Sequence, residues 1–211
     1  MKQSWELITR GSAEEFVTCL RREAEEHPAV RHPYLERLAR GQLPSVRLAL
    51  MDYAHQYSFY SSHFPEYLES VINTLASAEH RSILYENLEE EQGNPKSDDP
   101  RDAPHTEIFA RFEAAIGIDA AYRASHKPSM TVELWRDLAL QKCRSEQIGV
   151  GVGAIGIGTE MVVPTIYGHI LDSIRSHTPL EEEDYYFFTL HAACDHEHAA
   201  ALIGITIDIA S

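Results

Sequence analysis

The sequence predicts an all-α protein, a bundle of roughly seven helices that forms a single domain over residues 1–211. Apolar residues recur at helical spacing between capping signals along most of the chain, and nowhere does a pattern require a β-strand. The one alternating run, IGVGVGAIGIG at 148–158, has helical patterns on both sides. With 211 residues, 44% of them hydrophobic, the chain is long enough to bury one full core.

Capping residues mark the helices of the first half. Ser12 opens a capping box and predicts the start of a helix at the segment AEEFVTCL. Pro33 and Gly41 stand where the next helix would begin and end. From Ser45 we expect a long helix, which Pro65 kinks or restarts.

The second half repeats this pattern around one loop. The segment AEHRSILYENLEEEQ predicts a helix that Gly93 ends, and the three prolines of 94–104 predict a loop. A helix resumes at HTEIFARFEAAIG, and a very long helical region covers about 130 to 176, interrupted near Pro164. We expect the last helix to start at Thr178, with Glu181 completing a second capping box.

Charge and cysteine content narrow the class of protein. A formal net charge of −15 argues against nucleic acid or an anionic membrane as a partner. The N-terminus, MKQSWELITRGSAEEF, lacks the apolar run of a signal peptide, and we see no uninterrupted apolar stretch of about 18 residues that would span a membrane. The three cysteines show no paired spacing, so we expect free thiols in a reducing cytoplasm: Cys19, Cys143 and Cys194.

The last helix carries the strongest functional pattern, FFTLHAACDHEHAAAL. His191, Asp195 and His198 are spaced by four and three residues, so their side chains leave one helix face. Apolar residues share that face, which therefore points into the bundle, where a metal ion would satisfy all three groups. His196 and Glu197 fall on other faces and are expected to be neighbours of the site, not ligands.

Other helices offer further ligands. Glu160 lies in the middle of the most apolar helix, and the loop 94–104 is preceded by Glu90 and Glu91 and followed by His105. Carboxylates and imidazoles contributed by four helices of a bundle are the ligand set of a dinuclear iron carboxylate site. Such ligands favour iron or manganese over zinc.

The strings ENLEEEQG, HTEIF, GTEMVVPTIYGHIL and DYYFFTLHAACDHEHAAAL resemble the haem-oxygenase-like diiron oxidases and oxygenases, also called iron-containing redox enzymes. The resemblance spans about residues 45 to 204 and implies a haem-oxygenase-like (thiaminase/PQQ-synthase-like) seven-helix bundle. It also implies a set of iron ligands, in which Glu91 is preferred over Glu90 because it lies two residues before Gly93: Glu91, His105, Glu160, His191, Asp195 and His198. Some family members use an extra carboxylate, for which Glu66 is the candidate.

The resemblance further implies the chemistry. Two Fe(II) ions would bind O2, give a peroxo-diiron(III) species and oxidise a small molecule bound beside it. Reactions in the family include oxidative C–C cleavage, N-oxygenation and oxidation of the protein's own side chain. We accordingly expect an O2-dependent oxidoreductase of specialised metabolism, with an external electron donor and a homodimeric assembly.

The glycines before Glu160 suggest where a substrate could lie. Gly149, Gly153 and Gly156 share its helix face and would leave a channel above it, or else allow another helix to approach closely. Lys142 and Arg144 are too far along the helix to hold a substrate carboxylate at the iron. The expected pocket residues are Gly153, Gly156, Val163, Tyr167 and Tyr57.

Several substrates remain open. An amino-acid-derived metabolite is favoured and would need a buried counter-charge for its ammonium, for which the candidates are Asp52, Glu66 and Glu86. A medium-chain fatty acid, decarboxylated oxidatively, would instead need the longer glycine-lined channel. Alternatives of another class are a metal-free thiaminase- or PQQ-synthase-like enzyme, and a self-sacrificing protein that consumes one of three tyrosines: Tyr53, Tyr57 or Tyr60.

Overall fold

The computed structural model describes residues 11–211, apart from the side chains of Ile148 and residues 193–196, and within this part every regular element is a helix. The all-α class is therefore confirmed. The α-helices are α2 (Ala13–Glu25), α3 (Pro33–Ala39), α4 (Val46–Ser61), α5 (Phe64–Ile72), α6 (Ala78–Gln92), α7 (His105–Ile116), α8 (Ala120–Ser125), α9 (Met130–Cys143), α10 (Ile148–Ile155), α11 (Val163–His177) and α12 (Tyr186–Ala210). Short elements are the 3-10 helices η1 (Pro100–Asp102) and η3 (Glu182–Asp184), and the π-helix η2 (Gly156–Glu160).

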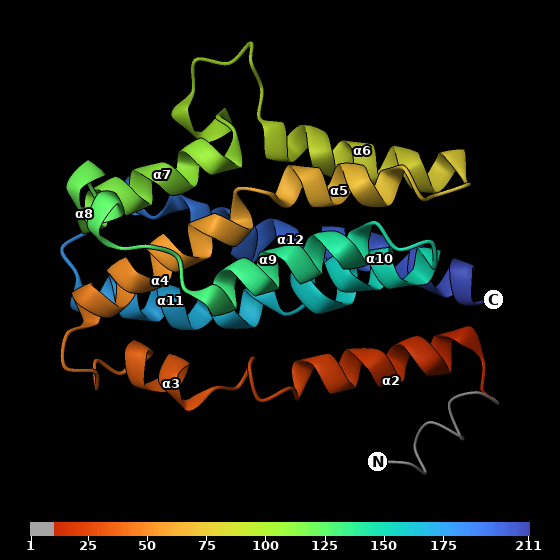
Figure 1. Cartoon of the computed structure of the whole chain (residues 1–211), viewed down its shortest axis with the longest axis horizontal. Coiled ribbons are helices and arrows are strands. Elements are labelled where there is room, and N and C mark those ends of the chain that lie inside the picture. The colour runs from red at the N-terminus through yellow and green to blue at the C-terminus, as the bar shows by residue number, and fades with distance from the viewer. Residues whose placement is uncertain (1–10) are drawn as a thin grey trace.

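The helices lie in three layers (Figure 1). Helices α2 and α3 cover one side of the molecule, α5 to α8 cover the opposite side, and the other helices lie between these two layers. In the middle layer α12 packs against α11 and α10, while α4 contacts both α7 and α9. The layer of α5 to α7 is joined to the centre through α4, α9 and α12.

Two apolar clusters form the core. One gathers α3, α4, α7, α11 and the start of α12, where Phe188 is fully buried. The other gathers α5, α6, α10 and the end of α12, where Leu202 is buried. Because α12 contributes to both clusters, its turns between Phe188 and Leu202 lie at the junction of the two. His191 and His198 belong to these turns.

Most predicted helix ends are confirmed. Ser12 accepts the backbone N–H of Glu15, whose side chain accepts that of Ser12, and together they make the capping box. Gly41 and Gly93 follow their helices at φ of +66° and +70°, which glycine adopts at little cost. At Gly93 a Cβ would also lie 2.6 Å from the backbone of the loop after it.

Two expected boundaries are wrong. Thr178 does not start the last helix, because its hydroxyl donates back to the carbonyl of Ile174 at the end of α11. The capping box nearby belongs to Glu181 and Asp184 of η3, and α12 begins at Tyr186. The long region from 130 is broken not only before Pro164 but also at 144–147, between α9 and α10.

One helical stretch, Gly149–His177, is long and apolar enough to cross a membrane by length and composition, although its 18-residue window is 44% buried inside the protein. The core helix of a globular bundle has the same properties, and the absence of a membrane partner stays a prediction.

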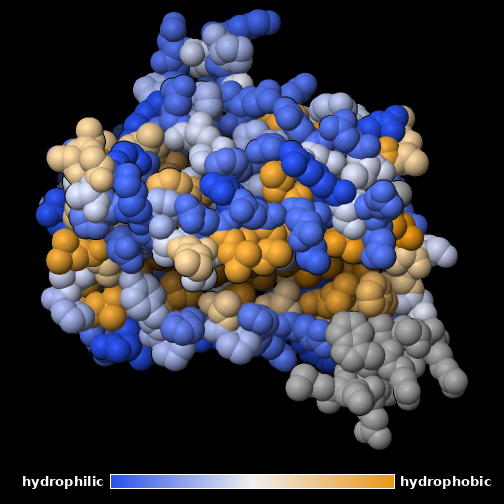
Figure 2. Space-filling model, in the orientation of Figure 1, coloured by the Kyte–Doolittle hydropathy of each residue, from blue (hydrophilic) through white to orange (hydrophobic). Residues whose placement is uncertain are grey.

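An apolar band crosses the face shown in Figure 2, at the level of α9. Its exposed residues in α9 are Met130, Leu134, Trp135 and Leu138. Of the three cysteines, Cys19 and Cys143 are free.

Candidate metal centre

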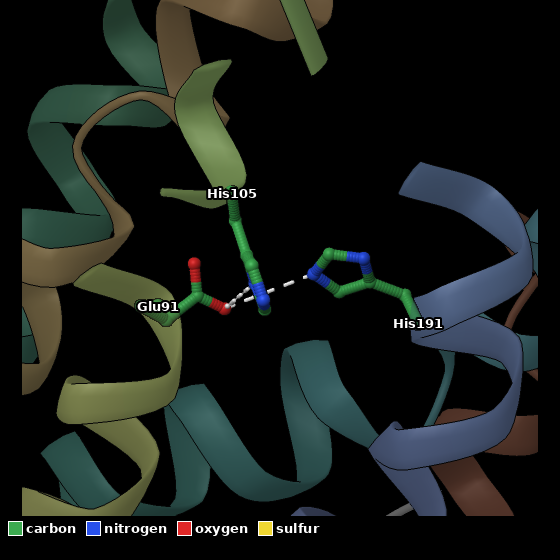
Figure 3. A group of neighbouring side chains, drawn as sticks. All are labelled: Glu91, His105 and His191. Carbon is green, nitrogen blue, oxygen red and sulfur yellow. Dashed lines mark ion pairs between the residues drawn. The ribbon is translucent and has the colours of Figure 1, made fainter. Parts of the chain in front are cut away.

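A cluster of three ligand-type side chains lies at the junction of the two apolar clusters. Glu91 is in the last turn of α6, His105 is the first residue of α7, and His191 lies near the start of α12. One ligand atom from each lies within 4.8 Å of those of the others. Figure 3 shows the three side chains converging from separate helices. Two of these helices are joined by the 94–104 loop, which brings α6 and α7 together.

The contacts within this cluster have the form expected around an ion. His105 Nδ1 lies 3.0 Å from Glu91 Oε1, yet this buried nitrogen makes no hydrogen bond. His191 Nδ1 donates to the carbonyl of Phe187 at 2.7 Å, so in the neutral ring, the form that binds a metal, Nε2 keeps its lone pair. Nε2 faces Glu91 Oε1 at 3.7 Å. A backbone carbonyl that fixes the ring in this way is the usual support of a metal-binding histidine. Carboxylate and imidazole donors of this kind suit iron.

Glu91 is prepared to bind as an anion. Burial raises the pKa of its carboxyl, but the imidazoles of His105 and His191 outweigh this and lower the pKa to about 2. The side chain is only 9% exposed, so few water molecules compete for it. Its neighbour Glu90 is 56% exposed and lies outside this cluster.

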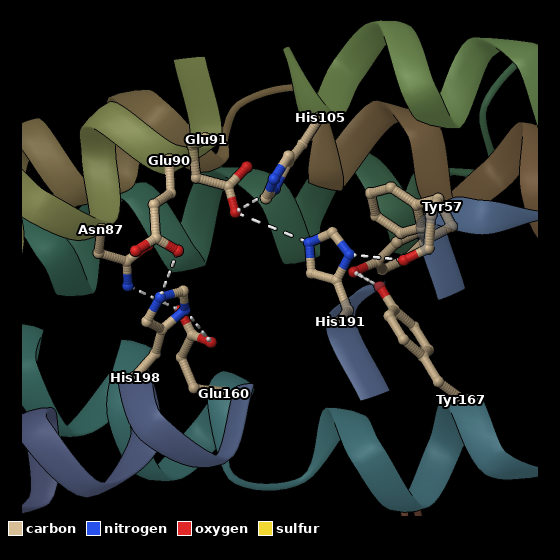
Figure 4. Close-up of polar contacts among 10 residues, drawn as sticks. Tyr57, Asn87, Glu90, Glu91, His105, Glu160, Tyr167, His191 and His198 are labelled. Carbon is tan, nitrogen blue, oxygen red and sulfur yellow. Dashed lines mark hydrogen bonds and ion pairs between the residues drawn. The ribbon is translucent and has the colours of Figure 1, made fainter. Parts of the chain in front are cut away.

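A second polar group lies about two turns further along α12 (Figure 4). His198 Nε2 lies 2.9 Å from Glu90 Oε2, and its Nδ1 lies 3.9 Å from Glu160 Oε2. The buried carboxylate of Glu160 also accepts a hydrogen bond from the Asn87 amide at 3.2 Å. Two neighbouring glutamates of α6, Glu90 and Glu91, thus each contact a histidine of α12, one in each group.

Glu160 is placed by a local change in helix geometry. It ends η2, the π turn between α10 and α11, where Met161 N–H donates to the carbonyl of Gly156. Such turns commonly occur at functional sites. Burial, joined by the charges of Glu91 and Glu90, raises the pKa of Glu160 to about 8 despite the Asn87 hydrogen bond.

The structure thus brings together Glu91, His105 and His191, and beside them Glu160 and His198. The side chain of Asp195, and that of His196, lie outside the described residues. Glu66 is not in this centre, which corrects the expectation of an extra ligand: it forms an exposed ion pair with Arg144 at 2.8 Å. The reason is that α5 buries Tyr67 and its neighbours and leaves Glu66 on the outer surface.

A cavity of about 400 Å³ adjoins the cluster, and Glu91, His105 and His191 form part of its wall. Of the predicted pocket residues, three line it: Tyr57, Val163 and Tyr167. The hydroxyl of Tyr167 donates to that of Tyr57 at 2.8 Å. Phe109 and Phe187 add apolar rings to the wall.

At Gly156 the structure supports the second of the two readings, close helix approach, and not the channel. A Cβ there would lie 2.6 Å from Leu202 Cβ, so this glycine lets α12 approach closely instead of leaving space. Gly153 has open space beside it, but neither glycine is part of the wall of the cavity. The π turn after Gly156 also changes the helical register that the prediction assumed.

Comparison with known proteins agrees with this centre. Residues 51–209 match the model of a family described as iron-containing redox enzymes. The chain belongs to this family. The resemblance inferred from the sequence motifs is thereby confirmed, and iron is the metal that the donor set and the family have in common.

Two named relatives and one solved structure extend the comparison. The 4-aminobenzoate synthases of Chlamydia muridarum (strain MoPn / Nigg) and Chlamydia trachomatis serovar D are each 25% identical over 170 residues. These residues are 80% of this chain and 67% and 69% of those proteins. A crystal structure of a CADD-like protein of unknown function from Nostoc punctiforme PCC 73102 has a TM-score of 0.62 at 16% identity. The match covers 92% of this chain and 91% of the Nostoc chain, and it shows that the two proteins share a fold.

Sequence reasoning missed one charged pair in the cavity wall. Arg123 of α8 donates to both oxygens of Glu113 of α7, at 2.9 and 2.8 Å. These hydrogen bonds raise the pKa of Arg123. The sequence did contain a signal for Glu113. It is a charged residue within the largely apolar segment FARFEAAIG, just as Glu160 is a charged residue within an apolar helix. The proposed counter-charges Asp52 and Glu86 are exposed instead.

Proposed function

We propose that this member of the iron-containing redox enzymes is a non-haem diiron oxidase or oxygenase that uses O2 to oxidise a small metabolite. The observation that carries the proposal is that Glu91, His105 and His191 converge within 4.8 Å and face a cavity of about 400 Å³. A substrate in that cavity would lie directly beside the metal ligands. The volume is within the range of small-molecule sites.

The donors divide between two ions. Glu91, His105 and His191 would hold one ion, and Glu160 with His198 would hold the other, supported by the predicted ligand Asp195 on the turn between the two histidines. Two iron ions held by these residues would supply the reductive activation of O2, with electrons from an external donor. The tight donor set of the first group and the burial of Glu160 favour this assignment.

The residues of the cavity would protect this chemistry from water. Phe109, Phe187 and Val163 provide apolar surface, and Phe109 and Phe187 pack edge to face at 4.8 Å. Tyr167 lies against His191, with ring centroids 6.0 Å apart, and its hydroxyl is held by Tyr57. A wall of this kind keeps bulk water away from a reactive oxidant.

The size of the cavity favours a short substrate, so we keep the amino-acid-derived metabolite as the leading candidate. A medium-chain fatty acid would need the extended channel that the packing of Leu202 on Gly156 closes. The two chlamydial relatives are named for making 4-aminobenzoate, an aromatic compound with an amine and a carboxylate. That name supports a small substrate carrying nitrogen.

A second candidate is oxidation of one of the protein's own tyrosines. Of the three tyrosines considered, Tyr57 lines the cavity that contains His191, whereas Tyr53 and Tyr60 line a neighbouring space of about 250 Å³. Tyr57 would therefore be the residue consumed. Mass spectrometry of the intact protein after a single turnover distinguishes the candidates, since only self-oxidation changes the mass of the chain.

The deciding experiment is an anaerobic Fe(II) titration with iron counted per chain, followed by O2-uptake assays. We expect near two irons for the wild type and a loss of at least one in Glu91→Ala. Glu89→Ala is the matched control, because Glu89 belongs to the same acidic run but is exposed. A wild-type protein that folds and binds no iron would refute the proposal and favour the metal-free alternative.

A further inference from the structure

The end of the cavity away from the metal ligands is lined by a pair of oppositely charged side chains. Glu113, 3% exposed, and Arg123, whose side chain is 41% exposed, both line the cavity and are joined by two hydrogen bonds. The pair has no net charge, and Arg123 keeps further N–H groups on its guanidinium beyond the two that Glu113 accepts. A neutral pair of this kind attracts a simple anion weakly, but it complements a group that carries both charges.

His55 supplies a third polar group at this end. It is 1% exposed, lines the cavity, and its Nε2 donates to the carbonyl of His126 at 2.7 Å. Its Nδ1 is buried and has no partner in the protein. With the proton on Nε2, a neutral ring leaves Nδ1 as a hydrogen-bond acceptor. A buried acceptor without a donor is costly, so a small movement of the ring that brings Nδ1 against a ligand N–H would be stabilised here.

Helix α7 sets the distance between the two ends. His105, Phe109 and Glu113 are four residues apart in turn and all line the cavity. Eight residues of α-helix rise about 12 Å. If a hydrogen bond at one end and the approach to the reacting atom at the other each take about 3 Å, roughly 6 Å remain for the substrate.

We propose that Glu113, Arg123 and His55 form a head-group site that binds the zwitterionic end of an amino acid. Arg123 receives the carboxylate, and Glu113 and His55 Nδ1 accept the N–H groups of the ammonium. The side chain of the amino acid then extends past Phe109 towards His105 and His191. This inference rests on the proposed function for the reaction, but the head-group site itself needs no iron.

The test measures binding to the metal-free protein by calorimetry. The probes are L-phenylalanine and L-norleucine, compared with 3-phenylpropanoate, which lacks the ammonium, and phenethylamine, which lacks the carboxylate. We expect at least one amino acid to bind, and L-phenylalanine to bind at least about tenfold more tightly than either of its analogues, since each of these leaves a charged group unpaired. If neither amino acid binds, or if 3-phenylpropanoate binds as tightly as L-phenylalanine, the proposal is overturned.

A conservative substitution assigns the binding to Arg123. Arg123→Lys keeps the charge beside Glu113 but loses the planar fork, and we expect it to weaken amino-acid binding about tenfold or more. Arg144→Lys is the control, because Arg144 also pairs with a glutamate, Glu66, but on the outer surface and through one hydrogen bond. Equal affinities for the two variants would contradict the assignment.

A measurement on the wild type does not depend on the folding of a variant. Arg123 is exposed enough to react with phenylglyoxal, and peptide mass spectrometry follows its modification. We expect the bound amino acid to protect Arg123 and not Arg144. Iron uptake separates the two proposals. A normal Fe(II) uptake by Arg123→Lys together with lost amino-acid binding supports the head-group site. Intact amino-acid binding by a wild-type protein that takes up no Fe(II) would refute only the diiron function.

Discussion

Replacing Gly156 by alanine tests how closely α10, η2 and α12 must pack. The new Cβ would lie 2.6 Å from Leu202 Cβ, whereas carbon atoms in contact prefer about 3.5–4.0 Å. The helices must therefore separate by about 1 Å, and overpacking of this kind costs about 1–3 kcal/mol. Neither atom can turn aside, because each Cβ is fixed to its backbone.

Gly153→Ala is the matched control for this substitution. Nothing lies within 4 Å of the Cβ it would create, and alanine has the higher helix propensity by about 1 kcal/mol. We expect the free energy of unfolding of Gly156→Ala to be about 1–3 kcal/mol lower than that of Gly153→Ala. With an m-value of about 2 kcal/mol per M, the urea midpoints should differ by about 0.5–1.5 M. Equal midpoints would refute the close approach of Leu202 and restore the channel.

Four further outcomes are expected. Anaerobic Fe(II) at about 100 times its Kd should add about 2.7 kcal/mol of stability and raise the Tm by roughly 5–10 °C in calorimetry, and an unchanged Tm would argue against a metal centre. Tyr167→Phe should lower the free energy of unfolding in urea by about 1 kcal/mol, through loss of the hydrogen bond to Tyr57. Glu66→Gln should change it by under about 0.5 kcal/mol and leave iron content intact, since the ion pair is exposed, and lost iron would make Glu66 a ligand after all. Arg123→Ala should cost about 2–3 kcal/mol, because buried Glu113 loses its partner, and a cost no larger than that of Arg144→Ala would contradict this.

The helices could be predicted from sequence wherever local signals decide them. Ser12 with Glu15, and the glycines at 41 and 93, are caps whose geometry depends on neighbouring residues. The predicted helix start at Thr178 was wrong because a threonine hydroxyl can cap the end of one helix as well as the start of the next. The break at 144–147 carries no proline or glycine, and its one capping signal is Ser145, whose hydroxyl accepts the N–H of Gln147.

The site could be predicted residue by residue but not in its contacts. Isolated polar residues in apolar helices pointed to Glu160, His191 and His198, and the same reasoning applied to α7 would have found Glu113. The sequence alone gives no means of telling that Glu90 faces His198 while Glu91 faces His105, since this depends on how α6 packs against α12 and α7. For Gly156 the sequence left two readings open, because only the position of Leu202 decides whether the space beside this glycine is empty or filled.

A rigid helix joins the two ends of the cavity. His105 and Glu113 belong to the same α-helix, in which Ile108, Phe109 and Phe112 are buried in the core. The spacing between His105 and Glu113 along the backbone therefore cannot change without unfolding α7. A substrate bound at Glu113 and Arg123 would extend towards the metal ligands. The length of the substrate then decides which of its atoms lies beside the metals. Orientation of this kind selects the bond to be oxidised, and it needs no contact with the reacting atom itself.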